Sequence, residues 1–428
     1  MLPLTIGMAQ GKCLHKHRCR LGLTAESPFL KLLGLDPIGL ARLRDFCVMT
    51  MSESANSIDK GMAGVVAAET NLSDVRGEIG ELIYCGYNIN DLAENATFEE
   101  VVHLLHRGHL PSGEELAALK AEFCASRELP GGVIDVLKAL PQDTSPMHAL
   151  RTGVSALGCF DSEAETQDDL EAVRKKSIQI IAQVPVIVAA FHRLRQGKEI
   201  LESDNNLGEA ANFIWLITGN KPSADMERTM DICYILHADH GFNASTFSGR
   251  VTIATLSDVY SAVTSAIGTL KGPLHGGANE GVIKMLQEIG DLEKVDAYVD
   301  DCLANKRRIM GIGHRVYRVL DPRAPHLKRM AQKLTKELGE PKWIQMSERI
   351  AELMLEKKNL NANVDFYSAT VYYSLDIPTD LFTPIFAIAR TAGWTAHMIE
   401  HLDGNRLIRP RAQYAGDEGK PWVPLAER

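Results

Sequence analysis

The sequence predicts an all-α protein, and three features carry that prediction. From about residue 98 onwards apolar residues recur with the period of a helix, and glycine or proline commonly stands where a periodic stretch ends. Two stretches open on capping boxes, Thr97 with Glu100 and Ser112 with Glu115. The chain shows no repeat of solenoid length, so we expect the helices to form one irregular body.

Residues 1–61 are the part of the chain for which we expect the least order. The segment is basic and has no acid before Glu26, which is typical of a targeting peptide. It could equally be upstream sequence read from a premature start, because Met49, Met51 and Met62 are all plausible initiators. We favour the second interpretation.

Ordered structure is predicted to begin near Val65. Alternating apolar and polar residues with glycine breaks between residues 71 and 89 suggest a small strand or hairpin. Helices are then expected near residues 98–107, 113–126, 170–197, 207–218, 224–239, 257–270, 279–289, 292–306, 325–338, 346–358 and 379–403. The most apolar of them, around residues 177–191, is interrupted by two glutamines and Pro185, so we interpret it as a core helix rather than a membrane span.

The composition excludes some functions. The chain has 428 residues, 45% of them apolar, which allows two or three domains or one large helical body. Its net charge of −9 and pI near 5.9 argue against a general nucleic-acid binder. Residues 306–329 are the exception, because they hold a cluster of lysines and arginines against only Asp321. Such a basic segment in an acidic protein suggests a local anionic ligand.

The 8 cysteines are scattered, and several, including Cys124, Cys233 and Cys302, fall in predicted helices. This distribution predicts a reducing, cytoplasmic setting rather than a disulfide framework. Residues 13–19 hold two cysteines and two histidines, but four ligands within seven residues is not a common zinc spacing. We therefore assign no metal ligands.

Two of the 14 histidines, His275 and His314, lie in glycine-rich motifs, where a backbone can approach a bound molecule closely. His275 lies in Gly-Pro-Leu-His-Gly-Gly-Ala-Asn and His314 in Gly-Ile-Gly-His-Arg-Val-Tyr-Arg. Arginines follow the second histidine. This composition indicates a site that handles a small anionic molecule by proton transfer.

Other histidines are assigned structural roles. His103, His106 and His109 lie on or just after one amphipathic helix, so we interpret them as surface or cap groups. His192 and His397 lie within long helices and are expected to be packed rather than catalytic.

His237 and His240 form a different pair. They lie in His-Ala-Asp-His-Gly-Phe-Asn, where a predicted helix runs out into Gly241. The C-terminus of a helix favours the charged form of histidine, which suits an anion. Both are therefore candidates for binding one.

Asp365 has two interpretations. It lies between apolar neighbours, and a poorly solvated carboxylate has a raised pKa and is a better base. Alternatively, Asn363 or Asp365 caps the helix that runs on through Tyr372. The residues by themselves favour the cap.

Several motifs together resemble those of the citrate synthase family, in the same order and approximate spacing. The likeness covers about residues 64–416, and type I-like bacterial members are the nearest in character. The motifs are His-Ala-Asp-His-Gly-Phe-Asn-Ala-Ser-Thr-Phe at 237–247, the two glycine-flanked histidine motifs at 272–279 and 311–317, Asp-Pro-Arg at 321–323, Asn-Val-Asp-Phe-Tyr-Ser at 363–368 and Ile-Arg-Pro-Arg at 408–411.

The resemblance implies condensation of acetyl-CoA with oxaloacetate and hydrolysis of citryl-CoA, with no metal or other cofactor. By position in the motifs, Asp365 matches the base that removes a proton from the acetyl methyl. His275 matches the group that donates a hydrogen bond to the thioester oxygen. His314 matches the group that protonates the oxaloacetate carbonyl.

The resemblance also assigns the residues that hold the substrates. It places His240, Arg323 and Arg390 around oxaloacetate, whose two carboxylates suit guanidinium forks. Arg409 matches an arginine that reaches across from the second subunit of a homodimer. The residues implied in CoA binding are Met310, Gly311, Ile312, Gly313, Arg315 and Arg318. The glycine pattern is not a Rossmann fingerprint, because Val316 stands where a third glycine is needed.

The family further implies two lobes. A large helical domain would comprise residues 62–274 and 378–428, and a smaller domain that binds CoA and carries catalytic groups would comprise residues 275–377. Closure of the lobes would complete the site and exclude water.

Two alternatives remain open. A 2-methylcitrate synthase, which uses propionyl-CoA, resembles citrate synthase in all these motifs, and one methylene is worth only about 1–3 kcal/mol in an apolar pocket. A non-catalytic CoA-binding helical scaffold predicts replacements in the catalytic set, and the sequence shows none. We expect neither nucleic acid nor membrane as a partner.

Overall fold

The structure, a computed structural model, describes residues 61, 62 and 64–428. The chain divides into two compact units, residues 1–69 and residues 70–428. In the first unit the described residues include a turn in which the Val65 amide donates to the Met62 carbonyl over 3.1 Å. The leader prediction and the cysteine and histidine cluster at 13–19 lie outside the described residues, apart from residue 61.

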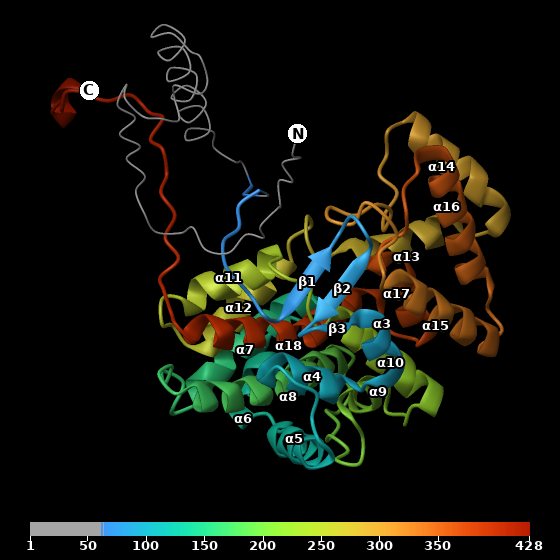
Figure 1. Cartoon of the computed structure of the whole chain (residues 1–428), viewed down its shortest axis with the longest axis horizontal. Helices are drawn as coiled ribbons and strands as arrows, with labels where there is room; N and C mark the ends of the chain where they lie inside the picture. Colours follow the sequence, from blue (N-terminus) through green and yellow to red (C-terminus); the bar gives the residue numbers. More distant parts are fainter. Residues whose placement is uncertain (1–60, 63) are drawn as a thin grey trace, which may run out of the picture. The chain divides into compact units, whose positions relative to one another are not determined.

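The second unit is mostly helical, which confirms the all-α prediction (Figure 1). Its α-helices are α3 (Ile89–Asn95), α4 (Phe98–Arg107), α5 (Gly113–Ser126), α6 (Gly131–Ala139), α7 (Pro146–Leu157), α8 (Leu170–Arg195), α9 (Glu209–Thr218), α10 (Ala224–His237), α11 (Ala244–Ile253), α12 (Val259–Leu270), α13 (Ala278–Ile289), α14 (Val295–Ala304), α15 (Ala324–Glu337), α16 (Lys342–Lys358), α17 (Val364–Ser374) and α18 (Phe382–Leu402). Short 3₁₀ turns η1 (Gly158–Phe160), η2 (Leu292–Lys294), η3 (Thr379–Leu381) and η4 (Leu425–Glu427) complete it.

The strand piece predicted before the helices is a small antiparallel sheet. Its strands β1 (Ser73–Arg76), β2 (Glu81–Tyr84) and β3 (Tyr87–Asn88) pair in sequence order. Ser73 lies opposite Tyr84 on the first pair, and Ile83 lies opposite Asn88 on the second. Tyr84 is fully buried and donates its hydroxyl to the Asp239 carbonyl over 2.7 Å, so the sheet is anchored on the loop after α10.

Both predicted capping boxes are present. The side chains of Thr97 and Ser112 accept from the amides of Glu100 and Glu115, whose carboxylates return to the amides of the capping residues. Local sequence therefore sets where α4 and α5 begin.

The centre of the helical body is formed by α18 and α8. Nearly all of α18 is buried, and Figure 1 shows it running across the middle of the unit. By length and composition α8 could cross a membrane, but 83% of its most apolar window is buried inside the protein. Pro185 lies within this helix, as the sequence indicated. Its apolar surface is that of a core helix, as predicted.

Candidate active site

The loop that follows α10 presents His240, and buried groups hold it in place. Asp239 is fully buried and accepts a hydrogen bond from the Gly241 amide over 3.0 Å. It also accepts one from the Ser73 hydroxyl of β1, and its Oδ1 lies 3.3 Å from His397 Nε2 of α18. A strand, a loop and the central helix are thus joined beside His240.

His240 meets two side chains from the loop that precedes α15. Its ring centroid lies 5.4 Å from that of His314 and 5.5 Å from that of Tyr317. His240 Nε2 lies 3.3 Å from the Tyr317 hydroxyl. Two of the predicted site residues, 74 positions apart in sequence, are therefore in contact.

The backbone fixes the tautomer of His314. Its Nδ1 accepts from the amides of Val316 and Tyr317, both over 3.0 Å. Burial, followed by the charge of Arg323, lowers the pKa of His314 to about 4, so the ring is neutral near pH 7. Because Nδ1 is an acceptor, the single proton lies on Nε2, where it is available to a ligand.

His275 is held in the opposite tautomer to His314. Its Nε2 accepts from the Ser245 amide over 3.3 Å and lies 2.9 Å from the Ser245 hydroxyl. Burial lowers the pKa of His275 to about 4. The neutral ring therefore carries its proton on Nδ1.

Asp365 is not the residue that caps α17. Asn363 is the cap, since its side-chain oxygen accepts from the Asp365 amide over 3.0 Å. Within residues 61–62 and 64–428, no donor contacts the Asp365 carboxylate. Burial raises its pKa to about 6, against the opposing charges of Arg323 and Arg390. The structure thus resolves the two interpretations against capping by Asp365.

Backbone contacts tie Asp365 to the loop before His314. The Asn363 amide donates to the Gly311 carbonyl over 2.9 Å, and its side-chain amide donates to the Gly313 carbonyl over 2.8 Å. Gly311 has φ of +72°, and a Cβ there would approach within 3.0 Å of the Phe366 backbone. Only glycine allows the loop and the start of α17 to come this close.

Arg323 and Arg390, the two buried arginines assigned to the site, differ in their partners. Arg323 forms a bidentate pair with Asp321, with contacts of 2.9 and 2.8 Å. Arg390 donates from Nε to the His237 carbonyl over 2.6 Å and lies over the Phe386 ring. In the described part of the chain, the terminal nitrogens of Arg390 contact no acceptor. Burial lowers the pKa of Arg390 to about 10, which leaves it charged and able to receive an anion.

The residues that the resemblance assigns to CoA form one loop and its continuation. Met310 and Ile312 lie inward, Gly313 has φ of +80°, and Arg315 and Arg318 are exposed. Arg409 is also exposed and belongs to the segment after α18, which runs out from the helical body in Figure 1. Arg409 contacts none of the other site residues within this single chain.

The small sheet supports the site in a way that the sequence did not indicate. The turn between β1 and β2 packs so closely on the loop after His314 that a Cβ at Gly77 would lie 2.3 Å from the Val316 carbonyl oxygen. The Arg318 amide donates to the Gly77 carbonyl over 3.0 Å. The sheet therefore contacts both the His240 loop and the His314 loop.

Two predictions about histidines were wrong. Burial, followed by the charges of Arg323 and Arg390, lowers the pKa of both His237 and His240, so neither is held in the charged form. Desolvation here outweighs the helix C-terminus. His103 and His106, expected to be surface or cap groups, are buried, whereas His192 and His397 are packed as predicted.

A family model for citrate synthase, C-terminal domain, matches residues 61–411. The chain belongs to the citrate synthase family. Citrate synthase 2 of Bacillus subtilis is 50% identical over 370 residues, which cover 86% of this chain and 99% of that protein. The 2-methylcitrate synthase 1 of Corynebacterium glutamicum is 42% identical over 380 residues, covering 88% of this chain and all of the relative.

A solved citrate synthase shares the fold. The enzyme from the archaeon Thermoplasma acidophilum, in a ternary complex with carboxymethyl coenzyme A and oxaloacetate, matches with a TM-score of 0.82 at 32% identity. The match covers 87% of this chain and all of that chain. Citrate synthase family membership makes the chain an enzyme of acyl-group transfer.

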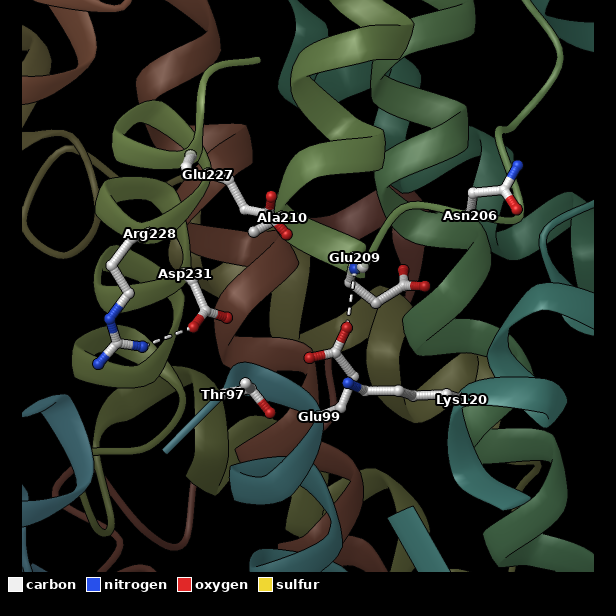
Figure 2. A pocket seen from close by; sticks show the side chains of 11 residues that line it. Thr97, Glu99, Lys120, Asn206, Glu209, Ala210, Glu227, Arg228 and Asp231 are labelled. Atoms are coloured by element: carbon white, nitrogen blue, oxygen red, sulfur yellow. Dashed lines mark hydrogen bonds and ion pairs between the residues drawn. The ribbon is translucent and has the colours of Figure 1, made fainter. Parts of the chain in front are cut away.

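A cavity of about 350 Å³ lies elsewhere, between α4, α9 and α10 (Figure 2). Glu99, Glu209 and Asp231 line it, together with Arg228. Figure 2 shows Glu99 accepting from the Glu209 amide and Arg228 pairing with Asp231. None of the predicted site residues lines this cavity, so its acids are separate from the histidine cluster.

Proposed function

We propose that this chain condenses acetyl-CoA with oxaloacetate and hydrolyses the citryl-CoA so formed to citrate and free CoA. Among the described residues, the observation that carries the proposal is a carboxylate without a donor and a guanidinium whose terminal nitrogens have no acceptor. In the part of the chain that the structure describes, the Asp365 carboxylate accepts no hydrogen bond and Arg390 pairs with no carboxylate. Arg390 is buried and Asp365 is half-buried, and both belong to the predicted set.

Asp365 is assigned as the base. With a pKa raised to about 6, it is ionised at neutral pH yet more basic than an ordinary aspartate. It takes a proton from the acetyl methyl, and the electron pair of that C–H bond moves toward the thioester carbonyl. The contacts of Asn363 support this role, because they hold the backbone of Asp365 and leave its carboxylate free.

The two neutral histidines are assigned to the two oxygens that gain charge. His275 donates from Nδ1 to the thioester oxygen and stabilises the enolate. His314 donates its Nε2 proton to the ketone oxygen of oxaloacetate as the new C–C bond forms. The tautomers set by Ser245 and by the amides after His314 leave these protons available. Water then cleaves the thioester and releases CoA as the thiol.

Arg323, Arg390 and His240 are assigned to the oxaloacetate site. The pairing of Arg323 with Asp321 leaves Arg390 as the stronger candidate for a direct bidentate contact with a carboxylate. Tyr317, which touches His240, is an additional candidate. Met310, Gly311, Ile312, Gly313, Arg315 and Arg318 are proposed to hold CoA. The open glycine loop and the exposed arginines support a contact with its adenine and phosphates.

We further propose a homodimer in which Arg409 completes the partner's oxaloacetate site. The exposed position of Arg409 in an extended C-terminal segment supports this assignment. Arg409→Ala should then behave as an oxaloacetate-binding defect that an intact partner complements in mixed dimers. Mixed dimers of Arg409→Ala with Asp365→Asn subunits separate the cases, because only an arginine from the partner can complete a site that keeps Asp365. If these mixed dimers are no more active than either variant alone, Arg409 does not act across the interface.

The division into lobes at residues 275–377 and 62–274 with 378–428 also belongs to the proposal, and so does lobe closure. A cytoplasmic location is proposed because the cysteines in the described part of the chain, Cys85, Cys124, Cys159, Cys233 and Cys302, are free thiols. The reaction as proposed requires neither a metal nor another cofactor.

A thiol-release assay with oxaloacetate and each acyl-CoA tests the function. We expect faster release of CoA from acetyl-CoA than from propionyl-CoA. A strong preference for propionyl-CoA would instead identify a 2-methylcitrate synthase. No release from either thioester would favour the non-catalytic scaffold.

A further inference from the structure

A cluster of two histidines and a glutamate joins α4 to α5, well apart from the residues assigned to catalysis. His103 comes from α4, His109 from the connecting turn and Glu115 from the first turn of α5. Of the described residues, these three form the group whose metal-binding atoms lie within 4.8 Å of one another. Two imidazoles and one carboxylate are a ligand set that zinc accepts.

The Nδ1 atom of each imidazole already has a hydrogen-bond partner. His103 Nδ1 lies 3.1 Å from the His109 carbonyl oxygen, and His109 Nδ1 lies 3.2 Å from the Arg107 carbonyl oxygen. A carbonyl oxygen only accepts, so each Nδ1 must donate its proton. In a neutral ring the other nitrogen, Nε2, then carries a lone pair and no proton. Backbone carbonyls commonly orient zinc-binding histidines in this way.

Both Nε2 atoms face the same carboxylate oxygen. Glu115 Oε1 lies 3.3 Å from His109 Nε2 and 3.9 Å from His103 Nε2. Two lone pairs directed at a carboxylate oxygen repel it unless a cation lies between them or each ring takes a second proton. The cluster as built therefore requires positive charge at its centre.

The spacing suits a small divalent ion. At zinc–ligand distances of about 2.0–2.1 Å, two tetrahedral ligands lie roughly 3.3 Å apart. The contact of His109 with Glu115 matches that separation. The contact of His103 with Glu115 is longer, by a shift that the exposed Glu115 side chain can supply. Glu115 Oε2 accepts from the Ser112 amide over 2.8 Å, which holds the carboxylate in position and leaves Oε1 for the ion.

We propose that His103 Nε2, His109 Nε2 and Glu115 Oε1 bind Zn²⁺, with water at the fourth position. The side chains of His109 and Glu115 are 57% and 45% exposed, so solvent reaches the open position. The ion would fasten the end of α4 to the start of α5. It takes no part in the proposed condensation.

The test uses the full-length protein, stripped with a chelator and titrated with Co²⁺ and then Zn²⁺. Cobalt bound by nitrogen and oxygen gives visible d–d bands without the thiolate charge-transfer band of a cysteine site. We expect one equivalent with that signature. Zn²⁺ should displace it and raise the melting temperature, because the ion binds the folded state.

His109→Ala and Glu115→Gln should each lower the affinity for Zn²⁺ by more than about tenfold, since losing a group that merely orients a ligand already costs about 10–100-fold. The glutamine side chain keeps an oxygen for the Ser112 amide, so the cap of α5 survives in Glu115→Gln. Neither variant should change the rate of CoA release. Cys13→Ser with Cys19→Ser is the matched control, because it removes thiols of the leader and should leave the cobalt signal intact.

Three results would overturn the proposal. The first is a wild-type protein that binds no cobalt, as expected if both histidines are doubly protonated. The second is a cobalt signal that is unchanged in His109→Ala. The third is a cobalt signal that is lost in the cysteine control.

Discussion

Two regions of this enzyme hold carboxylates with raised pKa values, and only one has the features of an active site. Burial raises the pKa of Asp365 to about 6, and it raises those of Asp231 and Glu209, beside the cavity of Figure 2, to about 7. A raised pKa is often taken to mark a functional site, but structural ion pairs perturb pKa values as well. By that measure alone the cavity would rank above the histidine cluster.

The difference lies in the partners. Asp231 accepts from the Phe98 amide and from Arg228, both over 2.8 Å. Glu209 accepts twice from Arg127 through one oxygen, over 2.9 and 2.7 Å, whereas its other oxygen is buried without a partner among the described residues. In the active-site region, by contrast, the Asp365 carboxylate has no donor and the end of Arg390 has no acceptor among the described residues. A carboxylate that has no donor at all, together with a guanidinium end that has no acceptor, distinguishes a site prepared for a substrate; burial by itself does not.

The variant expected to have the largest effect on turnover is Asp365→Asn. A general base typically contributes about 10²–10⁴ in rate, so turnover should fall by at least that range while oxaloacetate binding is retained. Thiol release measures the first quantity and calorimetric titration with oxaloacetate the second. The matched control is Asp231→Asn, also a buried acid with a raised pKa, which should lower stability and leave turnover near normal. A larger loss of rate in the control would reverse the assignment of the two regions.

Removal of His275 should have the next largest effect. His275→Ala removes one donor to the thioester oxygen, which costs about 10²–10³ in kcat. Ser245→Ala should cost less, because the backbone amide of Ser245 still contacts Nε2 and holds the tautomer. Steady-state kinetics of both variants checks the order, and equal losses would place the hydroxyl itself in the chemistry.

Replacing Arg390 should affect oxaloacetate binding, whereas replacing Arg127 should affect stability. Arg390→Met should raise KM for oxaloacetate by about 10- to 100-fold, the loss of a charge-assisted pair, with little change in the melting temperature. Arg127→Met leaves Glu209 buried and unpaired, which costs about 3–5 kcal/mol of stability. Thermal melts and oxaloacetate titrations of both variants separate the effects. A stability loss in Arg390→Met that matched Arg127→Met would mean that Arg390 is structural.

The pH dependence should also differ between the regions, although the effects are smaller. Because Asp365 must be ionised, kcat/KM should fall as pH drops below about 6. The raised pKa values of Glu209 and Asp231 mean that the folded state binds more protons than the unfolded state between about pH 4 and 7. Their contribution to stability is therefore complete below that window and is lost as pH rises through it. Asp231→Asn should flatten this stability slope without moving the rate profile, and an unchanged slope would contradict the assignment.

Much of the fold follows from local sequence. The boxes at Thr97 and Ser112 begin α4 and α5 as predicted, because capping depends on residues within one turn. Helices α6 and α7 were not predicted, and neither has a side-chain cap. Helix α11 was missed because it is rich in small and β-branched residues, and its packing against α12 stabilises it instead. Asn243 does cap α11, a local signal that the prediction did not use.

The site was predictable as a set of residues but not as a geometry. Motifs indicated His275, His314 and Asp365, whereas Ser245 and Tyr317 were missed because their contacts lie far away or depend on loop shape. The residues by themselves favoured a cap at Asn363 or Asp365, because the sequence cannot show which of these two polar residues turns toward the backbone; the cap is Asn363. His103 was taken for a surface group because the helix pattern does not reveal that the following turn folds back over it.

The most direct test of the account is proton exchange at the acetyl methyl. The enzyme is incubated in D₂O with acetyl-CoA and a dicarboxylate that lacks the ketone, so that condensation cannot follow, and deuterium in the methyl group is measured by mass spectrometry. The account predicts incorporation by the wild type and by Asp231→Asn, and none above background by Asp365→Asn. Exchange by Asp365→Asn at the wild-type rate would contradict it.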